Sequence, residues 1–252
     1  ESEVEAYLLG AKCFYTVFAG LSALGVVCNS FLVYTTIRTK SLRAPCNVLI
    51  GACALFDVMH QIIPEMGVAA GTFTVFSIGI DRFLSIAVAN KYRSMNVTSY
   101  LAVQFAFIFL YCAYNAFLIV FFYGDRQLIC NMPSVYNGVA VAFWAYSASV
   151  LNVAAFVIYL VTWRLIKAHS SNVESSTTDR IFRTIVLVTI FDLGGWVTTQ
   201  AIVATLNLAP LPPHKLLCYV CFASIFVNLG VAVKFMVYFF TRYSKGSVVR
   251  KR

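Results

Sequence analysis

Long apolar runs with few charges alternate with short polar stretches along almost the whole chain. Most runs hold about 20 residues or more, the length that a helix needs to cross a hydrocarbon core about 30 Å thick. Helices satisfy their own backbone hydrogen bonds in lipid, and no alternation of apolar and polar positions over about ten residues indicates a membrane barrel. The pattern therefore predicts seven membrane-spanning helices, at residues 13–37, 44–63, 66–89, 100–123, 137–163, 184–208 and 216–241.

The composition points the same way. Hydrophobic residues make up 60% of the 252 residues and charged residues 12%, whereas soluble domains hold about 45–50% and about 25%. A soluble fold of this size cannot bury so much apolar surface. We therefore expect an all-α membrane protein with one seven-helix domain over residues 1–252, in which 242–252 form a basic juxtamembrane tail.

Basic residues are distributed unevenly between alternate loops. If the N-terminus lies outside the cell, fifteen of the 19 Lys and Arg residues fall on the inner side and three on the outer side, while Lys234 falls inside a span. The positive-inside rule then predicts an extracellular N-terminus and a cytoplasmic tail. We interpret the net charge of +9 as a source of attraction to the anionic inner leaflet. It does not indicate nucleic-acid binding, because the charges flank the spans instead of covering one face.

The sequence contains one glycosylation sequon, Asn96-Val97-Thr98. It falls in an inner loop on this topology, so we interpret it as a chance occurrence. A glycan on Asn96 would argue against the orientation.

Three ionisable residues lie inside predicted spans: Asp57, Asp192 and Lys234. Each costs about 2.5–3.5 kcal/mol at the centre of a spanning helix, so each is expected to face the bundle interior with a partner or water. Lys234 either extends to the inner interface or pairs with Asp57. Asp192, beside Gly194 and Gly195, either faces a water-filled cavity or bonds to neighbouring helices.

An acid-arginine-aromatic triplet, Asp81-Arg82-Phe83, ends the third predicted span just before a basic loop. At the edge of a membrane helix such a triplet is typical of a signalling receptor. Together with Asn29 and Asp57 and the order of the spans, it resembles a rhodopsin-like G protein-coupled receptor. More closely, the chain resembles the nematode serpentine chemoreceptors of the Srsx class. The matching segments lie at 56–61, 63–67, 71–72, 78–86, 195–199 and 238–243.

The resemblance implies roles for particular residues. Asp81 would pair with Arg82 or an inner-loop partner at rest, and Arg82 would be freed on activation to meet a G protein. Asp81, Arg82, Phe83 and Tyr238 would form the coupling switch, and Trp196 would lie near the floor of the ligand pocket. The expected interior polar network consists of Asn29, Asp57, Asp192 and Lys234.

The resemblance also implies partners and a location. The partners would be an unidentified small-molecule or peptide ligand, a heterotrimeric G protein and the lipid bilayer. The receptor would serve chemosensation of the olfactory kind as a multi-pass protein of the plasma membrane, with a sensory cilium as a candidate site. No cofactor is implied, because Lys234 does not occupy the position of the opsin lysine that holds retinal.

The chain departs from the family's pattern between its second and third spans. Asp57 and Asp81 are only 24 positions apart, yet the chain must rise from mid-bilayer, turn and descend the full thickness. That path needs about 10 residues upward and about 25 downward. We therefore infer that a segment has been lost, with Gln61/Ile62 as the expected junction. The third-helix cysteine is lost with it, which leaves Cys130 without an evident disulfide partner.

Two alternatives to a working receptor stay open. An ion-coupled transporter would use Asp57, Asp192 and Lys234 as a relay. A truncated, signalling-dead isoform or gene-model artefact of the same family would explain the lost segment. Enzyme chemistry has little support, because the three histidines are scattered and no nucleophile-base arrangement is visible. Cys218 and Cys221 have CxxC spacing within an apolar span, and no metal site is predicted from this pair.

Overall fold

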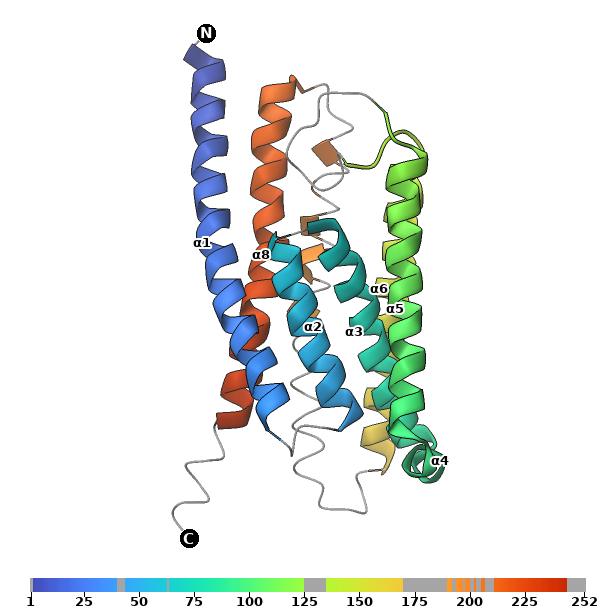
Figure 1. Cartoon of the computed structure of the whole chain (residues 1–252). Coiled ribbons are helices and arrows are strands. Elements are labelled where there is room, and N and C mark those ends of the chain that lie inside the picture. The colour runs from blue at the N-terminus through green and yellow to red at the C-terminus, as the bar shows by residue number, and fades with distance from the viewer. Residues whose placement is uncertain are drawn as a thin grey trace. The chain divides into compact units, whose positions relative to one another are not determined.

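In the computed structural model, the described residues are 2–39, 44–62, 64–124, 135–169, 190–191, 194–196, 198–199, 202, 205–206 and 211–243. Their helices, shown in Figure 1, are α1 (Ser2–Arg38), α2 (Pro45–Ile62), α3 (Pro64–Ala87), α4 (Ala89–Ser94), α5 (Val97–Phe121), α6 (Ala140–His169) and α8 (Pro213–Tyr243). The predicted span at 184–208 lies largely outside the described residues, although those of its positions that are described are helical.

The chain divides into two compact units. The first comprises Glu1–Cys28 and Arg180–Arg252, and the second comprises Asn29–Asp179. The second unit therefore contains the end of α1 and all of α2, α3, α4, α5 and α6.

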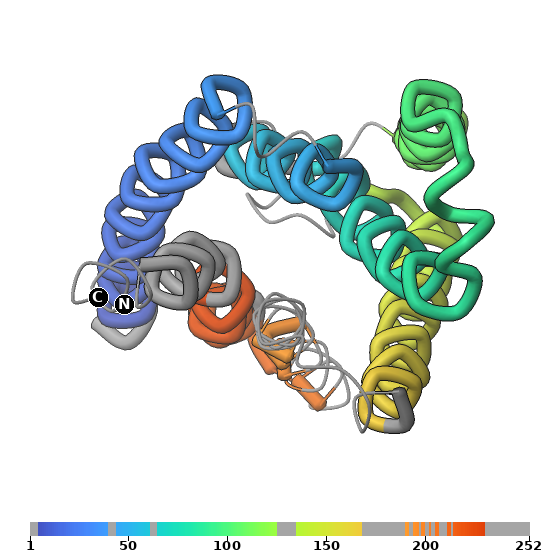
Figure 2. The backbone as a smooth tube through the Cα atoms, turned by 90° about the horizontal axis from the view of Figure 1, so that it is seen from below, coloured from blue at the N-terminus to red at the C-terminus, as the bar shows by residue number. Residues whose placement is uncertain are grey.

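The central helix of the second unit is α3. Within its most apolar window 61% of the residues are buried, against 22% for α5 and 17% for α6. The end-on view of Figure 2 shows α3 between α2 and α6, with α5 alongside. A helix enclosed on several sides presents small or apolar residues in most directions, as Val68, Ala69, Ala70, Val75 and Ile78 of α3 do.

Helix α3 packs closely against α2 and α6 because glycines face both neighbours. A Cβ atom on Gly67 would overlap the backbone of His60 in α2. On the other side, a Cβ on Gly79 would lie 3.4 Å from the Tyr159 ring of α6. The Tyr159 hydroxyl donates to the Val75 carbonyl at 3.0 Å, which satisfies a buried donor and ties α6 to α3. Figure 1 shows the adjoining ends of α2 and α3 below the upper end of α5.

Helix α5 begins at a capped residue and presents an apolar surface. Asn96 is the N-cap, and its side-chain oxygen accepts from the backbone N–H groups of Thr98 at 3.0 Å and Ser99 at 3.2 Å. The helix contains no charged residue. Phe109 is 72% exposed and Val120 75% exposed. Such a surface is unfavourable in water and suited to lipid.

In the first unit, aromatic contacts join the start of α1 to α8. The ring of Tyr7 lies 5.6 Å from that of His214, and the ring of Phe14 lies 5.9 Å from that of Phe222. Between them, Gly10 lets the helices approach, because a Cβ there would stand 3.3 Å from the Cys218 sulfur. In the same unit, the Thr199 hydroxyl donates to the Ala223 carbonyl at 2.8 Å.

Four helices in the described part of the chain are long and apolar enough to cross a membrane: Glu5–Arg38, Glu65–Ala87, Val97–Phe121 and Ala140–Lys167. Two shorter apolar stretches, Pro45–His60 and His214–Leu229, lie in α2 and α8. The seven individual span boundaries stay predictions. Helix α1 begins at Ser2, before the span predicted at 13–37, and α6 ends at His169, after the span predicted at 137–163.

Candidate functional site

The Asp81-Arg82-Phe83 triplet lies in the last two turns of α3. The Asp81 side chain is completely buried, whereas the Arg82 side chain is 19% exposed. Phe83 is half-buried. A carboxylate in this position must be paired, because an unpaired buried charge is strongly unfavourable.

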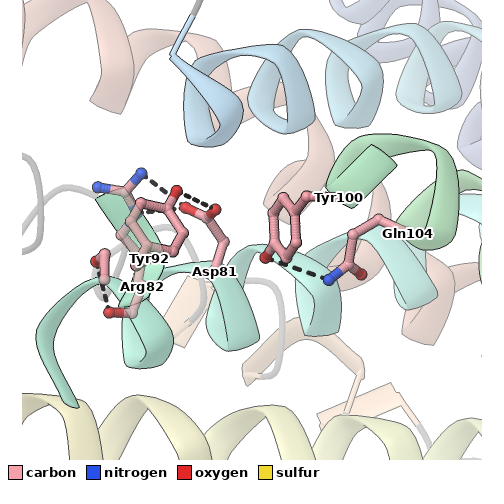
Figure 3. Close-up of polar contacts among 6 residues, drawn as sticks. Asp81, Arg82, Tyr92, Tyr100 and Gln104 are labelled. Carbon is pink, nitrogen blue, oxygen red and sulfur yellow. Dashed lines mark hydrogen bonds and ion pairs between the residues drawn. The ribbon is translucent and has the colours of Figure 1, made fainter. Parts of the chain in front are cut away.

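Arg82 is the first partner of Asp81. Two guanidinium nitrogens donate to the same carboxylate oxygen, Oδ2: Nη2 at 2.8 Å and Nε at 3.2 Å (Figure 3). Hydrogen bonds between a guanidinium and a carboxylate are stronger than neutral ones, and the flat guanidinium holds its direction. The neighbouring residues of the triplet therefore restrain each other.

Tyr92 is the second partner of Asp81, and it lies in α4, directly after α3. Val88 separates α3 from α4, and the one short turn of α4 returns Tyr92 toward the end of α3. Its hydroxyl donates to the other oxygen, Asp81 Oδ1, at 2.7 Å. Burial, together with the hydrogen bond and the charge of Asp81, raises the pKa of the Tyr92 phenol, so this group remains a donor at neutral pH.

Tyr92 also contacts the beginning of α5. The ring of Tyr100 meets the ring of Tyr92 edge-on, with 6.1 Å between centroids. The Tyr100 hydroxyl accepts from Gln104 Nε2 at 3.2 Å, and both residues are buried (Figure 3). The triplet of α3 is thus connected through Tyr92 to the beginning of α5.

Helix α2 closes the other side of the arginine. Cys46, in the first turn of α2, is buried with its sulfur beside the Arg82 guanidinium. The exposed part of Arg82 can leave this position only by giving up its contacts with Asp81 and Cys46. We term Asp81, Arg82, Tyr92 and Cys46 the arginine lock.

The predicted interior polar network is only partly described. Asn29 and Asp57 are both buried in the second unit, and no hydrogen bond joins them. Neither side-chain atom of Asn29 has a hydrogen-bond partner among the described residues. Asp57 Oδ1 lies 3.8 Å from the place of a Cβ on Gly71, so that glycine leaves room beside the carboxylate. Asp192 and the side chain of Lys234 lie outside the described residues.

Two other predicted residues belong to the first unit. Trp196 is helical and half-buried. The side chain of Tyr238, in α8, lies outside the described residues. Cys130, which was expected to lack a disulfide partner, also lies outside them. The seven cysteines among the described residues form no disulfide, and Cys46, Cys53 and Cys221 are buried. No cluster of metal-ligating side chains occurs within the described ranges.

Sequence reasoning did not identify Tyr92 or Cys46 as members of the site. The available signal for Tyr92 was a tyrosine between two basic residues, Lys91 and Arg93, in the loop that follows the triplet. Cys46 gave no signal, because a cysteine at the start of an apolar helix is usually a packing residue.

One comparison with known proteins identifies a family. The family model described as serpentine type 7TM GPCR chemoreceptor Srsx matches residues 22–64 and 61–245. The two matched segments meet at residues 61–64, where α2 ends and α3 begins. No curated protein matches the chain.

Proposed function

Since the chain belongs to the Srsx family of serpentine seven-transmembrane chemoreceptors, we propose that it binds an extracellular ligand and activates a heterotrimeric G protein. The observation that carries this proposal is the arginine lock. An arginine at the end of the central helix is held by a buried carboxylate, which is itself held by a tyrosine from the following loop. Both restraints are reversible hydrogen bonds.

In this mechanism the lock belongs to the resting state. Activation separates Arg82 from Asp81 and turns the guanidinium toward a G protein that docks at this end of α3. Arginine suits this task because it stays charged in both states and makes directional hydrogen bonds. The ligand acts by favouring the unlocked arrangement, and it shifts the population only as far as it binds the two arrangements differently.

The experiment measures basal GTP exchange in membranes that hold the full chain and one Gα subunit at a time from a panel. Asp81→Asn keeps an oxygen that accepts from Tyr92 but removes the charge that holds Arg82. Hydrogen bonds to charged groups contribute about 1.5–3 kcal/mol, and the partial exposure of Arg82 favours the lower end. Basal exchange should therefore rise about tenfold.

Arg82→Ala should abolish exchange with every Gα subunit, both alone and combined with Asp81→Asn. Arg93→Ala is the matched control, because Arg93 is an exposed arginine of α4 outside the lock. It removes the same charge and should leave exchange unchanged. Equal exchange by Asp81→Asn, Arg82→Ala and the unaltered chain throughout the panel would refute the proposal.

The alternatives gain no specific support. A transporter relay would need Asp57, Asp192 and Lys234 to meet, and two of these side chains lie outside the described residues. A signalling-dead isoform would share the family match, and the Asp81→Asn assay separates it from a working receptor. The proposed location is the plasma membrane, with the N-terminus outside and the lock facing the cytoplasm.

A further inference from the structure

A buried acid lies at the end of α3 opposite the arginine lock. Glu65 occupies the first turn of α3. Both of its carboxylate oxygens are buried without a partner at good hydrogen-bond geometry among the described residues, although the Tyr136 hydroxyl lies close to the carboxylate. The mechanism proposed above does not use this group.

A chain of hydrogen-bonded aromatic and polar residues begins beside Glu65. Tyr136 lies beside the Glu65 carboxylate and is fully buried. Its hydroxyl donates to Asn115 Oδ1 at 3.0 Å, and Asn115 Nδ2 donates to the Tyr111 carbonyl at 2.8 Å. The Tyr111 hydroxyl in turn lies 3.3 Å from Ser147 Oγ. The Tyr136 hydroxyl therefore donates to Asn115, and it offers Glu65 a neutral group and no positive charge.

Two of the hydrogen-bonded tyrosines also stack on other aromatic rings. Tyr136 stacks on Trp144 of α6, with centroids 5.2 Å apart and planes 23° apart. Tyr111 stacks on Tyr114 of α5 at 6.1 Å. Three helices thus contribute to one group around the carboxylate, and we term Glu65, Tyr111, Asn115, Tyr136 and Trp144 the acidic aromatic cluster.

The parts of α3, α5 and α6 that build this cluster contain no Lys or Arg. Helix α5 contains none, and α6 contains none before Arg164. A buried carboxylate is strongly unfavourable unless a cation pairs with it. Aromatic faces also attract cations, most strongly where water is excluded. Both features of the cluster therefore select the same kind of chemical group, a compact organic cation.

We propose that the acidic aromatic cluster is the ligand subsite of this receptor and that it takes the ammonium group of an organic amine. The ammonium group pairs with the Glu65 carboxylate and lies against the rings of Tyr136 and Trp144. This inference rests on the proposed receptor function, because it names the ligand class of the same protein. It concerns binding alone and adds no covalent step.

The experiment measures binding to the purified full-length chain in lipid nanodiscs, without a G protein. The probes are 2-phenylethylamine, which is protonated at pH 7, and 2-phenylethanol, which has the same shape without the charge. Thermal unfolding is followed as each probe is titrated. The amine should stabilise the protein with a half-saturating concentration at least about tenfold below that of the alcohol.

Glu65→Gln keeps the size of the side chain and removes its charge, so it should abolish the preference for the amine. Glu5→Gln is the matched control, because Glu5 is an exposed glutamate of α1, and it should retain the preference. Infrared difference spectra of the unaltered chain minus Glu65→Gln supply a second measurement that does not depend on unfolding. They should show an ionised carboxylate when the amine is bound.

Several results would overturn the proposal. These are equal binding of amine and alcohol, binding of neither, an unchanged preference in Glu65→Gln, and a carboxyl that stays protonated with the amine present. Amine binding that appears only in His60→Gln or Arg126→Gln would instead assign Glu65 to an internal ion pair. The binding assay contains no G protein, so it tests ligand binding separately from GTP exchange. Failure of the binding proposal can therefore be distinguished from failure of the receptor proposal.

Discussion

Asp81 divides its two carboxylate oxygens between two kinds of partner. Oδ2 accepts both bonds from Arg82, its neighbour in sequence, and Oδ1 accepts from Tyr92, eleven positions later. The first contact depends only on adjacent residues of one helix. The second requires α4 to hold its single turn in place. Tyr92 therefore links the charge state of the lock to the structure of a loop.

Replacing Tyr92 with phenylalanine should loosen α4 while leaving the ion pair. The variant loses a hydrogen bond to a charged acceptor, and Tyr92 is only partly buried, so the expected loss is about 1.5 kcal/mol. Amide hydrogen exchange in α4 should accelerate about tenfold. Tyr123→Phe, at a tyrosine that is 79% exposed, should leave α4 exchange unchanged. Unaltered protection of α4 in Tyr92→Phe would show that the hydrogen bond does not hold the turn.

The two halves of the lock differ in how far the sequence predicted them. The family resemblance implied a pairing of Asp81 with Arg82 or an inner-loop residue, and in the structure the carboxylate contacts both Arg82 and Tyr92. The functional roles of these residues stay predictions. The sequence did not predict that Tyr92 and Cys46 contact the triplet, because their positions depend on how α3 meets α4 and α2. Glu65 was missed because the predicted span began at residue 66.

At the scale of the element, Asn96 explains why α5 begins where it does. Its side chain satisfies two backbone N–H groups that the first turn leaves without helical partners. The glycosylation sequon at this position therefore overlaps a residue with a structural task.

Asn96→Ala should lower the free energy of unfolding by about 1 kcal/mol, because alanine cannot accept these hydrogen bonds. Asn96→Asp keeps the acceptor and should stay within a few tenths of a kcal/mol of the unaltered chain. Thermal unfolding in nanodiscs measures both. Equal stability of the alanine and aspartate variants would exclude a capping role, and a glycan found on Asn96 would contradict the predicted orientation.

The α2–α3 pair depends on a glycine at its tightest point. Gly67→Ala places a methyl group against the His60 backbone, which cannot move aside as a side chain can. Overpacking of this kind costs about 1–3 kcal/mol or more. At Gly20 of α1, a Cβ meets nothing within 4 Å, so Gly20→Ala should stabilise the helix by up to about 1 kcal/mol. Midpoints of thermal unfolding should therefore move in opposite directions, and a shift of both midpoints in the same direction would contradict the close approach.

At the scale of the whole molecule, the predicted class is confirmed. The resemblance to the Srsx chemoreceptors agrees with the family match, and the predicted all-α membrane architecture of the seven-transmembrane type agrees with that match and with the apolar helices. Apolar runs made this prediction possible, because hydropathy depends on composition and not on partners. Pairing across the bundle does not follow from hydropathy, so Lys234 as a partner of Asp57 stays a prediction.

The orientation of the chain is a prediction with a direct measurement. Fifteen basic residues on one side against three on the other should hold the N-terminus outside. An epitope tag before Glu1 should bind antibody on intact cells, and a tag after Arg252 should do so only after permeabilisation. Reversed accessibility of the two tags would place the arginine lock outside the cell and remove its G protein partner.

Helix α3 holds Glu65 in its first turn and Arg82 near its last, and no proline interrupts it between them. At 1.5 Å per residue the two side chains are separated by about 25 Å along a single rod. Because the helix is unbroken, we expect a shift or rotation of the Glu65 end to move the Arg82 end as well. Gly67 and Gly79 hold α3 in close contact with α2 and α6, so such a movement would displace those two helices as well.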